Sequence, residues 1–214
     1  MTNDEFLKYC FSRPIQNGDE WFWHEDVYSP EPETLFHHLN FTFKSSAKIV
    51  EQYLPDQIGL GMKFIFGIGS QYFETLYNSN NSSLPIWIDE IRFSMKFVYD
   101  EIFEPLADRK LSHLIKEASE TSILNQTLYM LGDCDSFEIP IWRDAKSEIS
   151  DNLISIFEYG LIKSNIAIIE SSIHALSHAS LVCPRAKTIL DKLYISSPVE
   201  LVSYLERARN DEIQ

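Results

Sequence analysis

The chain has 214 residues and a formal net charge of −14, from 32 acidic and 18 basic side chains. This charge disfavours binding to nucleic-acid backbones and to anionic membranes, and it favours either a basic partner or plain solubility. With 44% hydrophobic and 13% aromatic residues, the chain is not expected to be disordered. Its length suits one domain, residues 1–214, with the option of a looser N-terminal part, residues 1–33.

The three cysteines, Cys10, Cys134 and Cys183, are odd in number and widely spaced. This pattern predicts reduced thiols in a cytoplasmic protein. The first ten residues, MTNDEFLKYC, lack the apolar stretch of a secretory signal peptide, so none is expected. The chain also lacks a run of about eighteen uncharged apolar residues, and we expect no membrane-spanning helix and no membrane partner.

Helical periodicity dominates the chain from residue 33 onward. Apolar side chains recur at steps of three and four, and seven glycines are too few for the turns of an all-β fold. We therefore predict an all-α fold, an irregular HEAT- or armadillo-like stack of antiparallel helix pairs with about 8–10 helices. An irregular helical bundle is the alternative. The expected helices include residues 3–11, 83–105, 110–119, 150–161 and 165–180.

Residues 19–33, DEWFWHEDVYSPEPE, combine six acidic side chains with four large aromatic ones and show no helical period. Aromatic side chains anchor protein interfaces, and carboxylates steer a basic partner into place. The alternative is that the aromatic side chains belong to the core beneath a solvated loop. From this stretch we select Trp21, Trp23, Glu25 and Asp26 as candidate contacts to a protein partner.

A second stretch of the same character, GDCDSFEIPIW, follows at residues 132–142 and is expected to be non-periodic. It adds Asp133, Asp135, Glu138 and Trp142 to the candidate binding residues. The chain has no glycine-rich phosphate loop and no basic patch interleaved with aromatic residues, so direct binding to nucleic acid is not expected.

The segment ESSIHALSHA places Glu170, His174 and His178 in one row of a helix, because residues four apart share a face. Two histidines at this spacing could bind a metal ion with a third ligand from elsewhere. Glu170 is, however, the only charged residue between positions 164 and 182, and a helix that is apolar nearly all round is buried. We therefore interpret the row as a buried, hydrogen-bonded polar seam that holds no metal.

The wider string NIAIIESSIHALSHA, with ELVSYLERA after it, resembles a C-terminal pattern of small helical-repeat proteins encoded beside bacterial polymorphic toxins. In that family the run reads roughly ESALHGLGH, so Glu170, His174 and His178 fall on the family's Glu and two His. The segment LYMLGDCD resembles the family's YMWWD, whose Asp corresponds to Asp133. The resemblance spans the C-terminal half of the chain.

Among the positions at which this chain departs from the family's pattern, four concern the family's glycines and tryptophans. Ala175 and Ser177 stand where the family has glycines, and Leu131 and Gly132 stand where it has tryptophans. The resemblance implies a HEAT-like protein in an immunity or antitoxin position, as in contact-dependent growth inhibition systems. It implies a small acidic protein that binds its cognate toxin, without enzymatic activity and without a cofactor.

We therefore expect an immunity protein that neutralises a basic nuclease toxin by blocking the toxin's active site. Nuclease domains are basic because they hold phosphates, so their inhibitor is expected to be acidic and aromatic. Two other functions stay open. One is a metal-dependent helical hydrolase that uses Glu170, His174 and His178; the other is a general peptide-binding helical scaffold.

Overall fold

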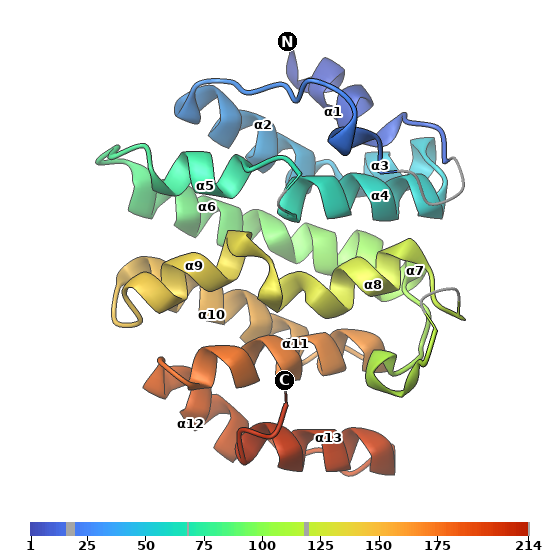
Figure 1. The fold of residues 1–214 in the computed structure, drawn as a ribbon, viewed down its shortest axis with the longest axis vertical. Helices are drawn as coiled ribbons and strands as arrows, with labels where there is room; N and C mark the ends of the chain where they lie inside the picture. The colour runs from blue at the N-terminus through green and yellow to red at the C-terminus, as the bar shows by residue number, and fades with distance from the viewer. Residues whose placement is uncertain (16–19, 68, 118–119, 214) are drawn as a thin grey trace.

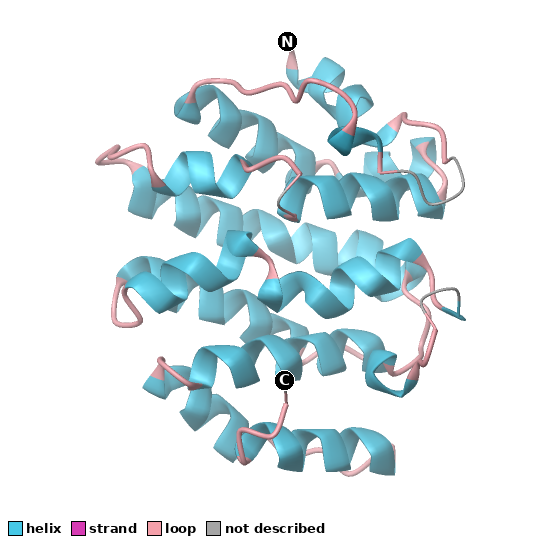
Figure 2. Ribbon diagram, viewed as in Figure 1, coloured by secondary structure: helices cyan, strands magenta, loops and turns pink. Residues whose placement is uncertain are grey.

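The computed structural model describes residues 1–15, 20–67, 69–117 and 120–213. Within these residues every regular element is helical, as Figure 2 shows, so the all-α prediction is confirmed. The α-helices are α1 (Asn3–Phe11), α2 (Pro32–Lys44), α3 (Ser46–Gln52), α4 (Pro55–Phe66), α5 (Tyr72–Tyr77), α6 (Leu84–Phe97), α7 (Glu104–Leu106), α8 (Ile123–Tyr129), α9 (Asp135–Arg143), α10 (Glu148–Gly160), α11 (Ile166–Ser180), α12 (Pro184–Lys192) and α13 (Val199–Arg209).

Shorter helical turns join these elements: η1 (Trp21–Trp23), η3 (Ser112–Leu114) and η5 (Met130–Asp133) are 3-10 turns, and η2 (Val98–Phe103) is a π-helical turn. The described residues thus hold more helical segments than the 8–10 predicted, because long predicted helices are divided. The helix expected over 83–105, for example, is α6, η2 and α7 in succession.

The helices pack in two rows along the long axis of the molecule (Figure 1). In one row α1 contacts α4, α4 contacts α8, α8 contacts α11, and α11 contacts α13. In the other row α2 contacts α6, α6 contacts α10, and α10 contacts α12. Each row turns its apolar face toward the other, which is how amphipathic helices share one core. The HEAT- or armadillo-like character of this stack stays a prediction.

The N-terminal residues share the main core. Phe6 and Phe11 of α1 and Trp21 and Phe22 of η1 belong to the same cluster of buried apolar side chains as the C-terminal helices. Helix α1 is capped by Thr2, whose hydroxyl accepts from the amide of Glu5 while the Glu5 side chain accepts from the Thr2 amide. No helix in the described ranges is long and apolar enough to cross a membrane.

Two local predictions were wrong, for identifiable reasons. The helix expected over 110–119 is, in its described part, a loop with the single turn η3, because the amides of Ser112 and His113 donate to the buried Glu170 carboxylate. The stretch 132–142, expected to be non-periodic, contains the last two residues of η5 and most of α9. Pro140 is tolerated inside α9 because Tyr77 donates its hydroxyl to the Ser136 carbonyl, the group that an amide at position 140 would have bonded.

Helix α11 lies at the centre of the C-terminal half, in contact with α8, α10, α12, α13 and η5. It is buried nearly all round, as its sequence predicted. Its N-terminus is fixed by Asn165, whose side-chain oxygen accepts from the amide of Ala167 and whose side-chain nitrogen donates to the carbonyl of Ala107. This packing holds the polar row of α11 in a defined position.

Candidate functional site

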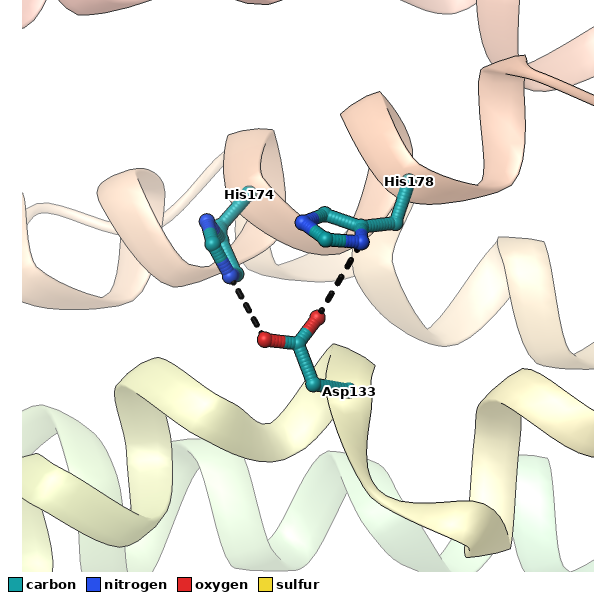
Figure 3. A group of neighbouring side chains, drawn as sticks. All are labelled: Asp133, His174 and His178. Atoms are coloured by element: carbon teal, nitrogen blue, oxygen red, sulfur yellow. Dashed lines mark hydrogen bonds and ion pairs between the residues drawn. The ribbon is translucent and has the colours of Figure 1, made fainter. Parts of the chain in front are cut away.

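The candidate site lies where η5 meets α11. His174 and His178 are one turn apart on α11, and Figure 3 shows both rings pointing at Asp133, the last residue of η5. His174 Nε2 lies 2.8 Å from Asp133 Oδ2, and His178 Nδ1 lies 3.6 Å from Asp133 Oδ1. One possible ligand atom from each residue lies within 4.8 Å of the others. The cluster therefore offers two imidazoles and a carboxylate to a proton or a cation.

Close packing of Gly132 on Ala175 brings Asp133 to this position. A Cβ atom on Gly132 would lie 2.2 Å from the Ala175 Cβ and 2.4 Å from the Ala175 Cα. A side chain at position 132 would therefore push η5 away from α11. Gly132 and Ala175 are two of the positions at which the sequence departs from the family it resembles, and in the structure they pack directly against each other.

Tyr204 of α13 fixes the orientation of His174 from the other side. Its hydroxyl lies 2.7 Å from His174 Nδ1 and 3.0 Å from the hydroxyl of Tyr129. Burial raises the pKa of both tyrosines, so both hydroxyls stay neutral and each can donate one hydrogen bond. A carboxylate only accepts, so a neutral His174 carries its proton on Nε2 and accepts from Tyr204 on Nδ1.

Glu170 belongs to a separate arrangement. Its side chain is fully buried. Oε1 accepts a hydrogen bond from the amide of His113 at 3.0 Å and lies 2.5 Å from His113 Nδ1. Oε2 accepts a hydrogen bond from the amide of Ser112 at 2.6 Å. The four-residue spacing predicted one hydrogen-bonded seam along the row, with bonds between neighbouring members. In the structure, both ring nitrogens of His174 bond elsewhere, to Tyr204 and Asp133. The helical row is therefore two sites and not one seam.

A pocket of about 320 Å³ opens beside Asp133, and Glu20, Trp23, Lys63 and Met130 are among its other lining residues. Glu20 lies 2.5 Å from Lys63 Nζ and accepts from Trp23 Nε1 at 2.8 Å. Burial favours the neutral form of Glu20, but the hydrogen bonds from Lys63 and Trp23 outweigh it and lower the pKa. The pocket thus brings together the two acidic and aromatic stretches that sequence analysis had selected separately.

The candidates of the first stretch have different environments. Trp21 is only 8% exposed and packs against Phe64, with its ring 4.4 Å from the guanidinium of Arg13. It is therefore a core residue and not a surface contact, because its indole fills space beneath η1. Trp23, two positions on, is 57% exposed. Glu25 is exposed and pairs with Arg13 at 2.9 Å, and Asp26 is exposed.

The candidates of the second stretch lie around the histidine cluster. Trp142 is 48% exposed, and with Glu138 it flanks a small surface hollow that also touches His178. Asp135 is the first residue of α9, and its side chain lies outside the described part of the structure. Asp133 lines the pocket together with Trp23 and also contacts His178, which neighbours Glu138 and Trp142, so Asp133 links the candidates of the two stretches.

Sequence reasoning missed His113 and Tyr204 as partners of the row. His113 stands in no recognisable motif, and Tyr204 stands in the string ELVSYLERA, which gives no sign of its partner; both residues reach α11 from elements distant in the sequence. His113 also stacks on the ring of Tyr204, with 4.4 Å between ring centroids, which links the two sites through one aromatic contact.

Comparisons with known protein families, with curated proteins and with solved structures give no match to this chain.

Proposed function

We propose that this protein is an immunity protein that binds a cognate bacterial toxin, a basic nuclease domain, and neutralises it by blocking its active site. The observation that carries the proposal is the pocket beside Asp133, where two acidic and aromatic stretches meet. An open pocket with an exposed aromatic side chain at its edge can receive an anchor residue of a partner. The family resemblance, which includes Asp133, Glu170, His174 and His178, supports the same function.

The charge of the pocket suits a basic partner. Its ionisable lining groups include two carboxylates, Glu20 and Asp133, and the ammonium group of Lys63, which pairs with Glu20. An arginine or lysine of the toxin could extend into the pocket beside Asp133 with its apolar stem against Met130 and Trp23. The net charge of −14 would in addition accelerate the encounter with a basic nuclease.

The contact surface of the proposal is the region bordered by Trp23, Asp133, Glu138 and Trp142. Glu25 and Asp26 contribute to electrostatic steering from its edge, because both are exposed. Trp21 supports the region only through packing, since its side chain is buried. A toxin of standard interface size would cover the pocket and both exposed tryptophans.

The experiment that tests the function uses the toxic domain encoded next to the gene for this chain. The two are co-expressed in bacteria, and growth is compared with that of cells that express the toxic domain alone. Calorimetric titration at low and high salt then measures binding. We expect growth rescue by this chain, a 1:1 complex and a dissociation constant that rises with salt, because charge attraction is screened. Failure to rescue growth, or an affinity that salt leaves unchanged, would contradict the proposal.

Single variants locate the contact surface. Trp23→Ala should weaken toxin binding by at least about tenfold, which corresponds to the loss of about 1.4 kcal/mol at an anchor residue. Phe93→Ala is the matched control, because Phe93 is an aromatic residue on α6 with 54% exposure, close to the 57% of Trp23. Equal losses of toxin affinity in both variants would show that the pocket is not the contact surface. Binding of this chain to unrelated peptides would favour the general peptide-binding scaffold.

A further inference from the structure

We propose that Asp133, His174 and His178 form a binding site for one divalent transition-metal ion such as Zn²⁺. Two imidazole nitrogens and a carboxylate oxygen are the donors that zinc and non-haem iron prefer in proteins. The ligand set differs from the row that the sequence suggested, because Asp133 takes the place of Glu170. The inference is independent of the proposed function, since a chain that binds zinc but no toxin would still have this site.

The spacing of the three residues fits an ion. Ligand atoms of a tetrahedral zinc site lie about 3.4 Å apart, given metal–ligand bonds of about 2.1 Å. The observed separations from the Asp133 oxygens are 2.8 Å to His174 and 3.6 Å to His178, on either side of that value. Figure 3 shows that both rings already face the carboxylate. Small side-chain rotations therefore suffice to close the three ligands around one ion.

Unsatisfied polar atoms distinguish this cluster from an ordinary hydrogen-bonded seam. Among the described residues, Asp133 Oδ1 and His178 Nε2 are both buried without a hydrogen-bond partner. A buried polar atom without a partner is destabilising, so native proteins rarely retain one without a reason. Coordination of a cation would give Asp133 Oδ1 a partner, and His178 Nδ1, the ring nitrogen that faces this oxygen, would be the neighbouring ligand.

The surrounding residues supply the outer shell that a metal site needs. Metal-bound histidines commonly hydrogen-bond through the second ring nitrogen, which fixes the ring and the tautomer. His174 has this arrangement: with Nε2 on the metal, Nδ1 carries the proton and donates to Tyr204, which can donate in turn to Tyr129. Because a hydroxyl both donates and accepts, this chain of bonds fits the site with and without an ion.

The site also has a free approach. Three protein ligands leave the fourth position of a tetrahedral ion open to water or to a ligand. Asp133 lines the pocket of about 320 Å³, which brings solvent to one of the three ligands. A metal ion here would also connect η5 to α11, and it would stabilise the fold by its binding free energy.

The test uses the full chain without a histidine tag. The protein is treated with chelator, dialysed against Zn²⁺ and analysed for metal content. In a second measurement, Co²⁺ is added and its binding is followed by visible absorption, which reports nitrogen and oxygen ligands. We expect one equivalent of metal and a higher melting temperature with Zn²⁺ than with chelator. His178→Gln should weaken binding by at least about a hundredfold, because loss of a ligand costs more than the 10–100-fold loss for an outer-shell partner.

Controls separate the site from adventitious binding. His37→Gln removes an exposed histidine on α2 and should leave metal content and affinity unchanged. Tyr204→Phe removes the bond to His174 Nδ1 and should weaken binding by about 10–100-fold without changing the stoichiometry. The proposal is overturned if the wild-type chain binds Zn²⁺ no more tightly than the His178→Gln chain, provided that circular dichroism shows both chains folded.

Discussion

At one end of the polar row on α11, Glu170 is completely buried, and its carboxylate accepts from two backbone amides and contacts His113. At the other end, Asp133 is 20% exposed, contacts His178 at 3.6 Å and has one oxygen without a hydrogen-bond partner among the described residues. Both are carboxylates that contact histidine on the same face of the fold. The difference indicates that the first site holds the structure together, while the second is available to a ligand.

The largest expected effect on stability is at Glu170, the fully buried end of the row. Glu170→Gln should reduce the free energy of unfolding by about 3 kcal/mol, because an amide cannot satisfy both backbone amides and His113 as the carboxylate does. Urea denaturation monitored by circular dichroism measures the change. Glu101→Gln, at an exposed position, is the control and should stay within about 0.5 kcal/mol of the wild type. A loss below about 1 kcal/mol for Glu170→Gln would remove the distinction between the two ends.

The next effect concerns the contact that positions Asp133. Gly132→Ala should cost about 1–3 kcal/mol, because its new methyl group would overlap Ala175 and displace η5 from α11. The double variant Gly132→Ala, Ala175→Gly should recover part of the loss, since the nearest atom is the Ala175 methyl group. A double-mutant cycle by urea denaturation tests this coupling, and strictly additive losses would show that the two positions do not press on each other.

A smaller effect is expected for the hydroxyl of Tyr204, the residue whose ring stacks on His113 and whose hydroxyl bonds His174. Tyr204→Phe should cost about 0.5–1.5 kcal/mol, because it removes hydrogen bonds to His174 and Tyr129 but keeps the aromatic stacking on His113. Thermal denaturation measures it, with Tyr194→Phe as the matched control because Tyr194 is 86% exposed. Equal effects of the two substitutions would mean that the hydroxyl of Tyr204 contributes nothing to the network.

The smallest effect on stability should be at Asp133, the partly exposed end of the row. Asp133→Asn keeps an oxygen that can accept from His174 Nε2, and its side chain is partly solvated, so stability should change by less than about 1 kcal/mol. The same urea series as for Glu170→Gln gives the comparison directly. A loss as large as that of Glu170→Gln would identify Asp133 as a second structural carboxylate and would weaken both the metal proposal and the assignment of the pocket.

Much of the helical architecture could be read from periodicity. The buried character of α11 followed from its near-uniform apolar composition, and the row of Glu170, His174 and His178 followed from the four-residue spacing. The prediction failed where local pattern conflicted with tertiary contacts. The amides of Ser112 and His113 left helical bonding for the Glu170 carboxylate, and Tyr77 replaced the hydrogen bond that Pro140 cannot make in α9.

The sequence by itself determined the helical class, the acidic charge and the helix on which the polar row lies, because these depend on composition and on short, regular spacing. The tertiary structure alone decided which carboxylate each histidine meets and which aromatic residues are exposed. Trp21 and Trp23 have the same side chain, but one packs on Phe64 and the other borders the pocket. The physical reason is that burial and pairing are properties of contacts between distant segments. Here those contacts depend on the close packing of η5 against α11, which is possible because Gly132 has no side chain.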